Sequence, residues 1–370
     1  MANFETALSL THARSNDPVL VPLDGSPLAE TALPWAVVLA RKWSAPLLLA
    51  RVVERDNYGA GSPAPVNSSE RELEVAAGSA YLHNQATTLR AAHPELTVYT
   101  ELAQGDPTIT LLEMEQLSGA RLAVLTTHGR TGLARWARGN VAEKITRHGV
   151  APVLLVRPWD QPEVLAGRPA DGRRGLRVVV PLDGSSLAQG VLPLAIELAA
   201  GDGGELIFTA MIQTHPEQSI GAYYHPRIEG QRQEANHYLD RLCGEVRAQG
   251  VSARSIVGIE HDVAGAIIDV ASTESADLIA LSTHGRGTLG RMLNGSIADR
   301  VAHAARVPVL LYRPPVQAVA RDAVSVDIER EQTTTAQTEF KHATPELEAG
   351  ARLTGESWVD VVPSETAAVR

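Results

Sequence analysis

Residues 19–27 read VLVPLDGSP, an apolar run that ends at an Asp-Gly turn. Short apolar runs bounded by turn residues are typical of buried strands, so we predict a strand followed at once by a tight turn. Ser26 suits a helix N-cap, and Pro27 suits the first helical position because its missing N–H costs nothing there. The apolar pattern then carries one helix on to Leu39. The stretch therefore predicts the opening of an α/β unit.

The same stretch returns as VVVPLDGSS at residues 178–186. A second motif, THGR, also occurs twice, at residues 127–130 and 283–286. In each copy the Asp of the turn precedes the His of this motif by roughly 100 residues, far more than the 20–50 residues of solenoid repeats. The repeated unit is therefore a whole domain, and features kept in both halves belong to the shared design.

We place the first domain at residues 17–158 and the second at 176–314, joined by a Pro- and Gly-rich linker at 159–175. In each domain, apolar strand segments alternate with helical stretches, which predicts a parallel sheet with helices on both faces. The expected strands are 19–23, 47–53, 96–102, 121–126 and 152–156 in the first half, and 177–182, 205–211, 253–257, 278–282 and 309–312 in the second.

The composition excludes several classes of protein. The net charge of −10 and the lack of a Lys/Arg-rich run argue against nucleic acid as a partner. Cys243 is the only cysteine, so the chain has no disulfide and no thiolate metal cluster, and we expect an inert or surface thiol. We also expect a cytoplasmic protein without membrane contact, because the chain shows neither a signal peptide nor a spanning segment.

The end of the chain differs from the two domains. Residues 315–370 carry ten acidic and five basic residues and few large apolar ones. Such a segment cannot bury enough apolar area to offset the entropy of ordering. We therefore expect an acidic, disordered tail, and prefer a solvated tail to a binding peptide.

Open parallel sheets bind ligands at the carboxyl ends of their strands, where the strand order reverses. We expect two loops to meet there in each half, one after the first strand and one after the fourth. The second loop leads into a helix whose first backbone N–H groups form an anion site suited to phosphates. The candidate residues are Asp24, Thr126, His128, Gly129, Gly139 and Asn140 in the first half, and Asp183, Ser282, His284, Gly285, Gly295 and Ser296 in the second.

Both halves resemble domains of the universal stress protein family, joined as a tandem pair. The resemblance covers roughly residues 17–158 and 176–314. It implies a Rossmann-like fold of the adenine nucleotide alpha hydrolase type: two tandem open parallel five-stranded sheets, each in strand order 3-2-1-4-5. The fifth strand of each sheet is then an apolar edge strand, which another element must cover or pair with. By the resemblance, we predict that the two fifth strands pair with one another as an intramolecular pseudo-dimer, and leave a higher oligomer open.

The ATP-binding members of this family carry Gly-x-x-Gly, nine residues, and then Gly-Ser/Thr. Set on this sequence, the second and third glycines fall on Gly129 and Gly139, and on Gly285 and Gly295. The departures from the pattern are at the first glycine, replaced by Thr126 and Ser282, and at the final hydroxyl, which is Ser296 in the second half but Asn140 in the first.

The resemblance also implies roles for residues on the first two strands. Pro22 and Asp24, and again Pro181 and Asp183, would flank the adenosine. Val52 or Met211 would face the adenine. The implied ligand is ATP, with or without Mg²⁺, in a regulatory stress-response protein with little or no turnover.

The sequence leaves several alternatives open. Asp24 and Asp183 are as well explained by turn formation as by contact with a nucleotide-bound metal ion. We interpret His128 and His284 as turn-stabilising residues that touch phosphate, since neither half shows a nucleophile beside them. GRGTLG at 285–290 matches the dinucleotide fingerprint, but follows the fourth strand instead of opening the first βαβ unit.

Two other functions also remain. A protein-interaction module without nucleotide would explain why Thr126 and Ser282 replace glycine. A slow ATPase or nucleotidyl transferase would use the same phosphate loop.

Overall fold

The computed structural model describes residues 17–54, 68–127, 141–158, 175–214, 224–283 and 296–314. The predicted tail at 315–370 and nearly all of the predicted linker lie outside these residues. The domain boundaries proposed above stay predictions.

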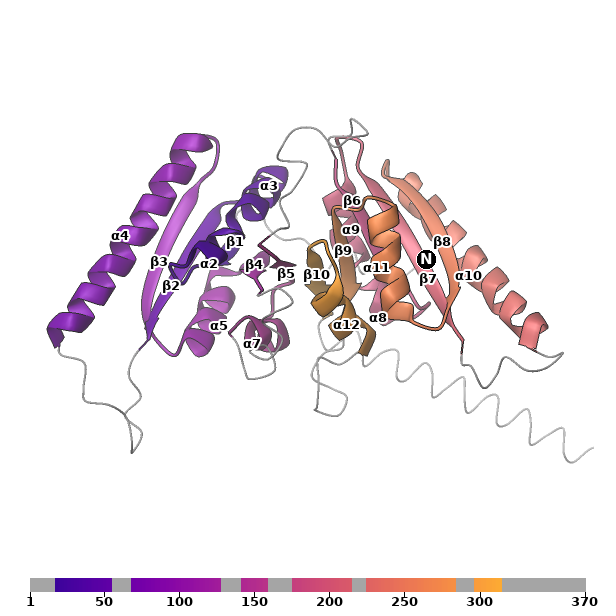
Figure 1. Ribbon diagram of the computed structural model, residues 1–370. Coiled ribbons are helices and arrows are strands. Elements are labelled where there is room, and N and C mark those ends of the chain that lie inside the picture. The colour runs from indigo at the N-terminus through magenta and orange to yellow at the C-terminus, as the bar shows by residue number, and fades with distance from the viewer. Residues whose placement is uncertain are drawn as a thin grey trace, which may run out of the picture. The chain divides into compact units, whose positions relative to one another are not determined.

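The first half contains five strands and five helices in its described residues (Figure 1). In chain order they are β1 (Val19–Pro22), α2 (Pro27–Glu30), α3 (Leu33–Trp43), β2 (Leu47–Glu54), α4 (Ser68–Ala92), β3 (Val98–Gly105), α5 (Pro107–Ser118), β4 (Leu122–Thr126), α7 (Val141–His148) and β5 (Val153–Val156).

The second half repeats this order. Its elements are β6 (Arg177–Pro181), α8 (Ser186–Gln189), α9 (Leu192–Ala199), β7 (Glu205–Gln213), α10 (Tyr224–Arg247), β8 (Ser252–Glu260), α11 (Val263–Thr273), β9 (Leu278–Ser282), α12 (Ser296–Ala304) and β10 (Val309–Tyr312).

All ten strands form one sheet in the order β3-β2-β1-β4-β5-β10-β9-β6-β7-β8. Within each half neighbouring strands are parallel and follow the predicted order 3-2-1-4-5. The halves join where β5 pairs with β10 in antiparallel fashion, with Leu154 opposite Leu310. We call this pairing the seam (Figure 1). The predicted pairing of the two fifth strands is therefore confirmed.

Two apolar clusters cover the two faces of the sheet. Alternate residues of a strand point to opposite faces, and along β1 Val19 and Val21 belong to one cluster while Leu20 belongs to the other. The first cluster includes residues of α3, α4, α9 and α10, and the second includes residues of α5, α7, α11 and α12. Each cluster draws on both halves, so the core is continuous across the seam.

The predicted helix start at Ser26 and Pro27 is confirmed, and α5 begins at a side-chain cap of the same kind. The Ser26 hydroxyl accepts a hydrogen bond from Ala29 N at 3.1 Å, and Pro27 opens α2. Asp106 caps α5 by accepting from the backbone N–H groups of Thr108 and Ile109. These caps satisfy backbone donors that a helix start leaves unpaired.

The prediction of one unbroken helix after each Asp-Gly turn is wrong. A helix of four residues and a longer second helix replace it in both halves, α2 and α3 in the first and α8 and α9 in the second. A proline inside a helix clashes with the carbonyl four residues before it. Pro34 and Pro193 each lie four residues after the last residue of the short helix, so the chain breaks there and starts again.

Cys243 is a buried core residue, 1% exposed, so of the two predicted alternatives it fits the inert thiol and not the surface thiol. It lies on the inner face of α10 in the first cluster. Burial raises the pKa of its thiol, which keeps the reactive thiolate form scarce at neutral pH.

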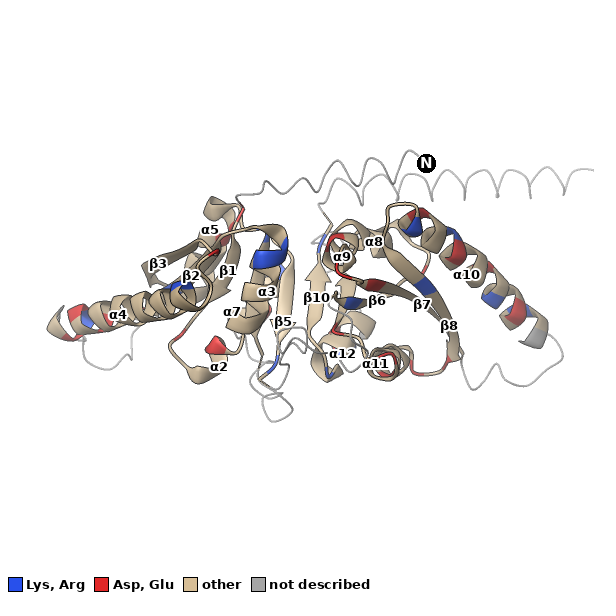
Figure 2. Ribbon diagram, turned by 90° about the horizontal axis from the view of Figure 1, so that it is seen from above, with Lys and Arg blue, Asp and Glu red and all other residues tan. Residues whose placement is uncertain are grey.

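The long helices α4 and α10 cover the outer strands of the sheet. On α10, acidic and basic residues alternate along the outer surface (Figure 2), and Arg232 pairs with Glu229 at 3.6 Å. Among the described residues, no helix is long and apolar enough to cross a bilayer.

Because the seam is buried, we expect the substitution of two leucines to have very different effects on stability. Leu154→Ala removes a side chain that is 1% exposed, and should lower the free energy of unfolding by roughly 2–5 kcal/mol. Leu117, which is 87% exposed on α5, provides the control, and Leu117→Ala should change it by less than about 0.5 kcal/mol. Urea unfolding measures both, and equal losses would contradict a packed seam.

Candidate functional site

The candidate site lies at the carboxyl ends of the central strands, which we call the carboxyl edge. In the first half β1 lies between β2 and β4, and in the second β6 lies between β7 and β9. The strand order therefore reverses at β1 and β6, where open α/β sheets bind ligands. Pro22 and Pro181 are the last residues of these two strands.

The turn after β1 is built in the same way as the turn after β6. Asp24 Oδ1 accepts a hydrogen bond from Ser26 N at 2.8 Å, and Asp183 Oδ1 accepts from Ser185 N at 2.9 Å. The glycines between them have φ of 87° and 86°, a left-handed conformation that favours glycine. Of the two roles left open for these aspartates, turn formation is confirmed, and contact with a metal ion stays a hypothesis.

Thr126 and Ser282 end β4 and β9 beside these turns. The Thr126 hydroxyl lies 3.5 Å from Ala29 O of α2, and Ser282 Oγ lies 3.3 Å from Ala188 O of α8. The next residue of each half continues the sheet, since Thr127 N donates to Val156 O at 2.8 Å. The hydroxyls that stand in place of a glycine therefore face the short helix of their own half.

Val52 and Met211 lie at matching positions on β2 and β7, and both are partly buried against the second cluster. Their partners in the sheet differ in size, because Val52 lies beside Ala103 while Met211 lies beside Gly258. A Cβ atom at Gly258 would stand 2.6 Å from Met211 Sδ. The second half thus combines a larger side chain on β7 with a smaller neighbour on β8.

The remaining predicted residues fall mostly outside the described part of the chain. These are His128, Gly129, Gly139 and Asn140, and His284, Gly285 and Gly295. Ser296 is the first residue of α12, and α7 begins at Val141, directly after the predicted loop of the first half. Both helices therefore begin where the sequence predicts the phosphate loop to end.

One polar cluster beneath the first turn was missed in the sequence. The Arg51 guanidinium lies over the Tyr81 ring, 5.1 Å from its centroid, and would be 2.7 Å from a Cβ atom at Gly25. The Tyr81 hydroxyl donates to Glu30 Oε1 at 2.9 Å, and Gln85 Nε2 donates to the same oxygen at 3.0 Å. Burial, and then this hydrogen bond to Glu30, raise the pKa of Tyr81 well above its usual value.

The second half lacks the strand arginine of this cluster, although the Arg241 guanidinium lies over the Tyr238 ring of α10, 5.9 Å from its centroid. Ala210 stands at the strand position of Arg51, and Gln189 ends α8 as Glu30 ends α2. A Cβ atom at Gly184 would meet nothing within 4 Å. The two turns therefore have the same backbone conformation but different side chains beneath them. The signal in the sequence for this difference was Arg51, a charged residue within the apolar strand β2.

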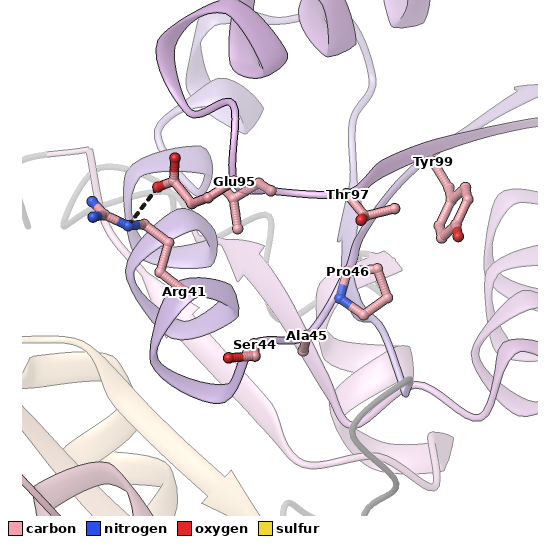
Figure 3. Close-up of a pocket in the computed structure, with 8 residues that line it drawn as sticks. Arg41, Ser44, Ala45, Pro46, Glu95, Thr97 and Tyr99 are labelled. Carbon is pink, nitrogen blue, oxygen red and sulfur yellow. Dashed lines mark ion pairs between the residues drawn. The ribbon is translucent and has the colours of Figure 1, made fainter.

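A pocket of about 380 Å³ lies at the opposite edge of the sheet, where β2 and β3 begin (Figure 3). It is lined by Arg41, Ser44, Ala45, Pro46, Glu95, Leu96, Thr97 and Tyr99, none of them a predicted site residue. The Arg41–Glu95 ion pair, 2.8 Å long, lies about half exposed at its rim. An exposed pair of this kind contributes little to stability. The pocket shares no lining residue with the turns and strand ends of the carboxyl edge.

Metal ligands do not gather in the described part of the chain. Among those residues, no group of three or more His, Cys, Asp or Glu side chains could hold a metal ion. A metal ion at the carboxyl edge would therefore need ligands from a bound nucleotide or from the loops at 128–140 and 284–295.

Two tandem open α/β domains with a shared Asp-Gly-Ser turn define a duplicated protein of the Rossmann-like class. The chain belongs to the universal stress protein family, whose family model matches residues 15–157 and again residues 176–313. The predicted family and fold are thus confirmed.

Two similar proteins match across both halves of the chain. Universal stress protein Rv2005c of Mycobacterium tuberculosis is 28% identical over 314 residues, which cover 82% of this chain and 99% of that protein. Universal stress protein Rv2623 of the same organism is 25% identical over 307 residues, covering 80% and 96%.

A solved structure agrees with the fold. The crystal structure of a universal stress protein from Archaeoglobus fulgidus matches with a TM-score of 0.61 at 17% identity, and covers 83% of this chain and 99% of that one. This likeness extends over both halves of the chain.

Because different side chains lie beneath the two turns, we expect the same glycine substitution to lower the free energy of unfolding by different amounts. Gly184→Ala forces a side chain into a left-handed conformation, which costs about 1–2 kcal/mol. Gly25→Ala should cost about 0.5–1 kcal/mol more, because its Cβ also displaces the Arg51 guanidinium from Tyr81. Urea unfolding of both variants, repeated in an Arg51→Ala background, measures the difference. Equal losses in the unmodified background would contradict this role of Arg51.

Proposed function

We propose that this protein binds an adenine nucleotide, ATP with or without Mg²⁺, at the carboxyl edge of each half. It would act as a regulatory protein of a stress response, with little or no turnover. The observation that carries the proposal is the identical Asp-Gly-Ser turn at the end of β1 and of β6, in a member of this family. A backbone loop is thereby held in a fixed conformation at the point where α/β sheets bind ligands.

The proposed roles of the side chains follow from their places at this edge. Pro181 and Asp183 would flank the adenosine in the second half, as Pro22 and Asp24 would in the first. Met211 or Val52 would face the adenine, and both side chains lie on the face that carries α12 and α7. Phosphates at the starts of α7 and α12 would meet backbone N–H groups and the positive end of the helix dipole.

We propose that the second half binds ATP more tightly. Around the end of β4 two threonines meet, with Thr31 Oγ1 3.3 Å from Thr126 Oγ1. At the end of β9 the matching pair is Gly190 and Ser282, which are smaller. The space that the Thr31 side chain fills in the first half is taken up by Pro314 in the second, since a Cβ atom at Gly190 would stand 2.9 Å from Pro314 Cγ. The preference for the second half therefore rests on the smaller hydroxyl residue at the end of β9 and on Ser296 at the first residue of α12, where the first half has Asn140.

Isothermal titration calorimetry with ATP tests this proposal on two matched variants. Gly295→Val should block the approach of backbone to a phosphate and cost about 2 kcal/mol or more of binding free energy. Gly139→Val makes the same change in the weaker half and should cost much less. Equal losses would mean two equivalent sites.

Two other outcomes would replace the proposed function. No binding of ATP by the unmutated chain would favour a protein-interaction module. Steady-state release of ADP would favour a slow ATPase.

A further inference from the structure

Two arginines cross the seam in a reciprocal manner. Arg157 follows β5 directly, and its Nη2 donates to Ala302 O of α12 at 2.7 Å. Arg313 follows β10 directly, and its guanidinium donates to Gly149 O at 2.7 Å and to Thr146 O of α7. Ala302 lies as far before Arg313 in the sequence as Thr146 lies before Arg157. The contact is thus built twice, each time from one half to the other.

Both arginines bind the carboxyl end of a helix. The last carbonyls of a helix have no partner within it and carry partial negative charge, so a cation there is stabilising. Arg157 is only 5% exposed, and its hydrogen bond is therefore little screened by solvent. Each contact fixes the end of α7 or α12 against a strand of the other half.

The other ends of these helices begin the proposed phosphate sites. At 1.5 Å per residue, a helix as short as α7 or α12 is about 12–14 Å long and moves as one rigid element. A displacement of its carboxyl end by the partner half therefore displaces the N–H groups at its amino end. The arginine of one half can in this way set the geometry of the site in the other.

The two helices are not held equally. In the first half Glu115 Oε1 accepts from Val150 N at 2.5 Å and also from Ala151 N, and so anchors the segment that follows α7. The matching residue of α11 is Ala271, which has no carboxylate. Helix α12 is tied to α11 by the Arg300–Asp262 pair, 2.7 Å long, but this pair is more than half exposed and so contributes little. The position of α12 therefore depends more on the buried Arg157 than the position of α7 depends on Arg313.

We propose that Arg157 and Arg313 are positioning residues in trans, each of which holds the ligand-binding helix of the other half and so couples the two sites. This inference rests on the proposed nucleotide binding at the carboxyl edge. Its strongest consequence is that Arg157, a residue of the first half, controls the affinity of the second.

Arg157→Met tests the proposal, because methionine keeps the apolar part of the side chain and removes the donors. The control is Arg121→Met, which removes another arginine that joins the two halves, one that pairs with Glu197 of α9 and lies over the Trp43 ring of α3. In calorimetry on the full chain, Arg157→Met should weaken the tighter ATP site about fivefold or more, and Arg121→Met should leave it within about twofold. Equal effects, or no effect of Arg157→Met, would overturn the proposal.

Amide hydrogen exchange tests how firmly α7 and α12 are held when no ligand is bound. Arg157→Met should speed amide exchange in α12 selectively, Arg313→Met should do so in α7, and Arg121→Met should do neither. If the unmutated chain binds no ATP, the proposed function fails and the coupling of sites fails with it. Exchange then decides the remaining part of the proposal, since a uniform change over all helices would overturn the positioning role.

Discussion

Strands β5 and β10 would each present a row of unpaired backbone N–H and C=O groups if the halves were separate. Both strands are apolar and buried nearly throughout, so water could not satisfy these groups without exposing hydrophobic side chains. Their antiparallel pairing removes both edges at once. The continuous core and the arginine contacts across the seam depend on this one interaction, because it brings α7 and α12 within reach of the opposite half.

The duplicated sheet holds two versions of one site. The turns after β1 and β6 have the same hydrogen bond and the same backbone conformation, which the shared Asp-Gly-Ser sequence dictates. Their surroundings have diverged, with Arg51 and Tyr81 beneath the first turn and Ala210 on the strand beneath the second. A duplicated domain is free to diverge in this way, because the scaffold is retained while each carboxyl edge changes separately.

The sequence predicted those parts of the fold that local chemistry decides. Strands β9 and β10 have the predicted bounds, since an apolar run ends at clear turn signals there. The short helix α2 was missed because the apolar pattern continues past Pro34, while the backbone cannot. Strand β3 extends to Gly105, beyond the predicted end, because hydrogen bonds to β2 support a polar stretch that lacks strand periodicity.

Much of the site could not be predicted because its contacts join residues far apart in the sequence. The contact of Arg51 with Tyr81 joins residues of β2 and α4, and the contacts of Arg157 and Arg313 join different halves. Such pairs depend on the tertiary arrangement, and no spacing along the chain marks them. The Asp-Gly turns were predictable because all of their hydrogen bonds are local.

We propose that each half offers one site for an adenine nucleotide and that the two sites differ in affinity. Native mass spectrometry of the full chain with increasing ATP counts the bound molecules directly. We expect a complex with one ATP at low concentration and a complex with two at higher concentration. A chain that stays free of nucleotide throughout the titration, or fills both sites with equal affinity, would contradict it.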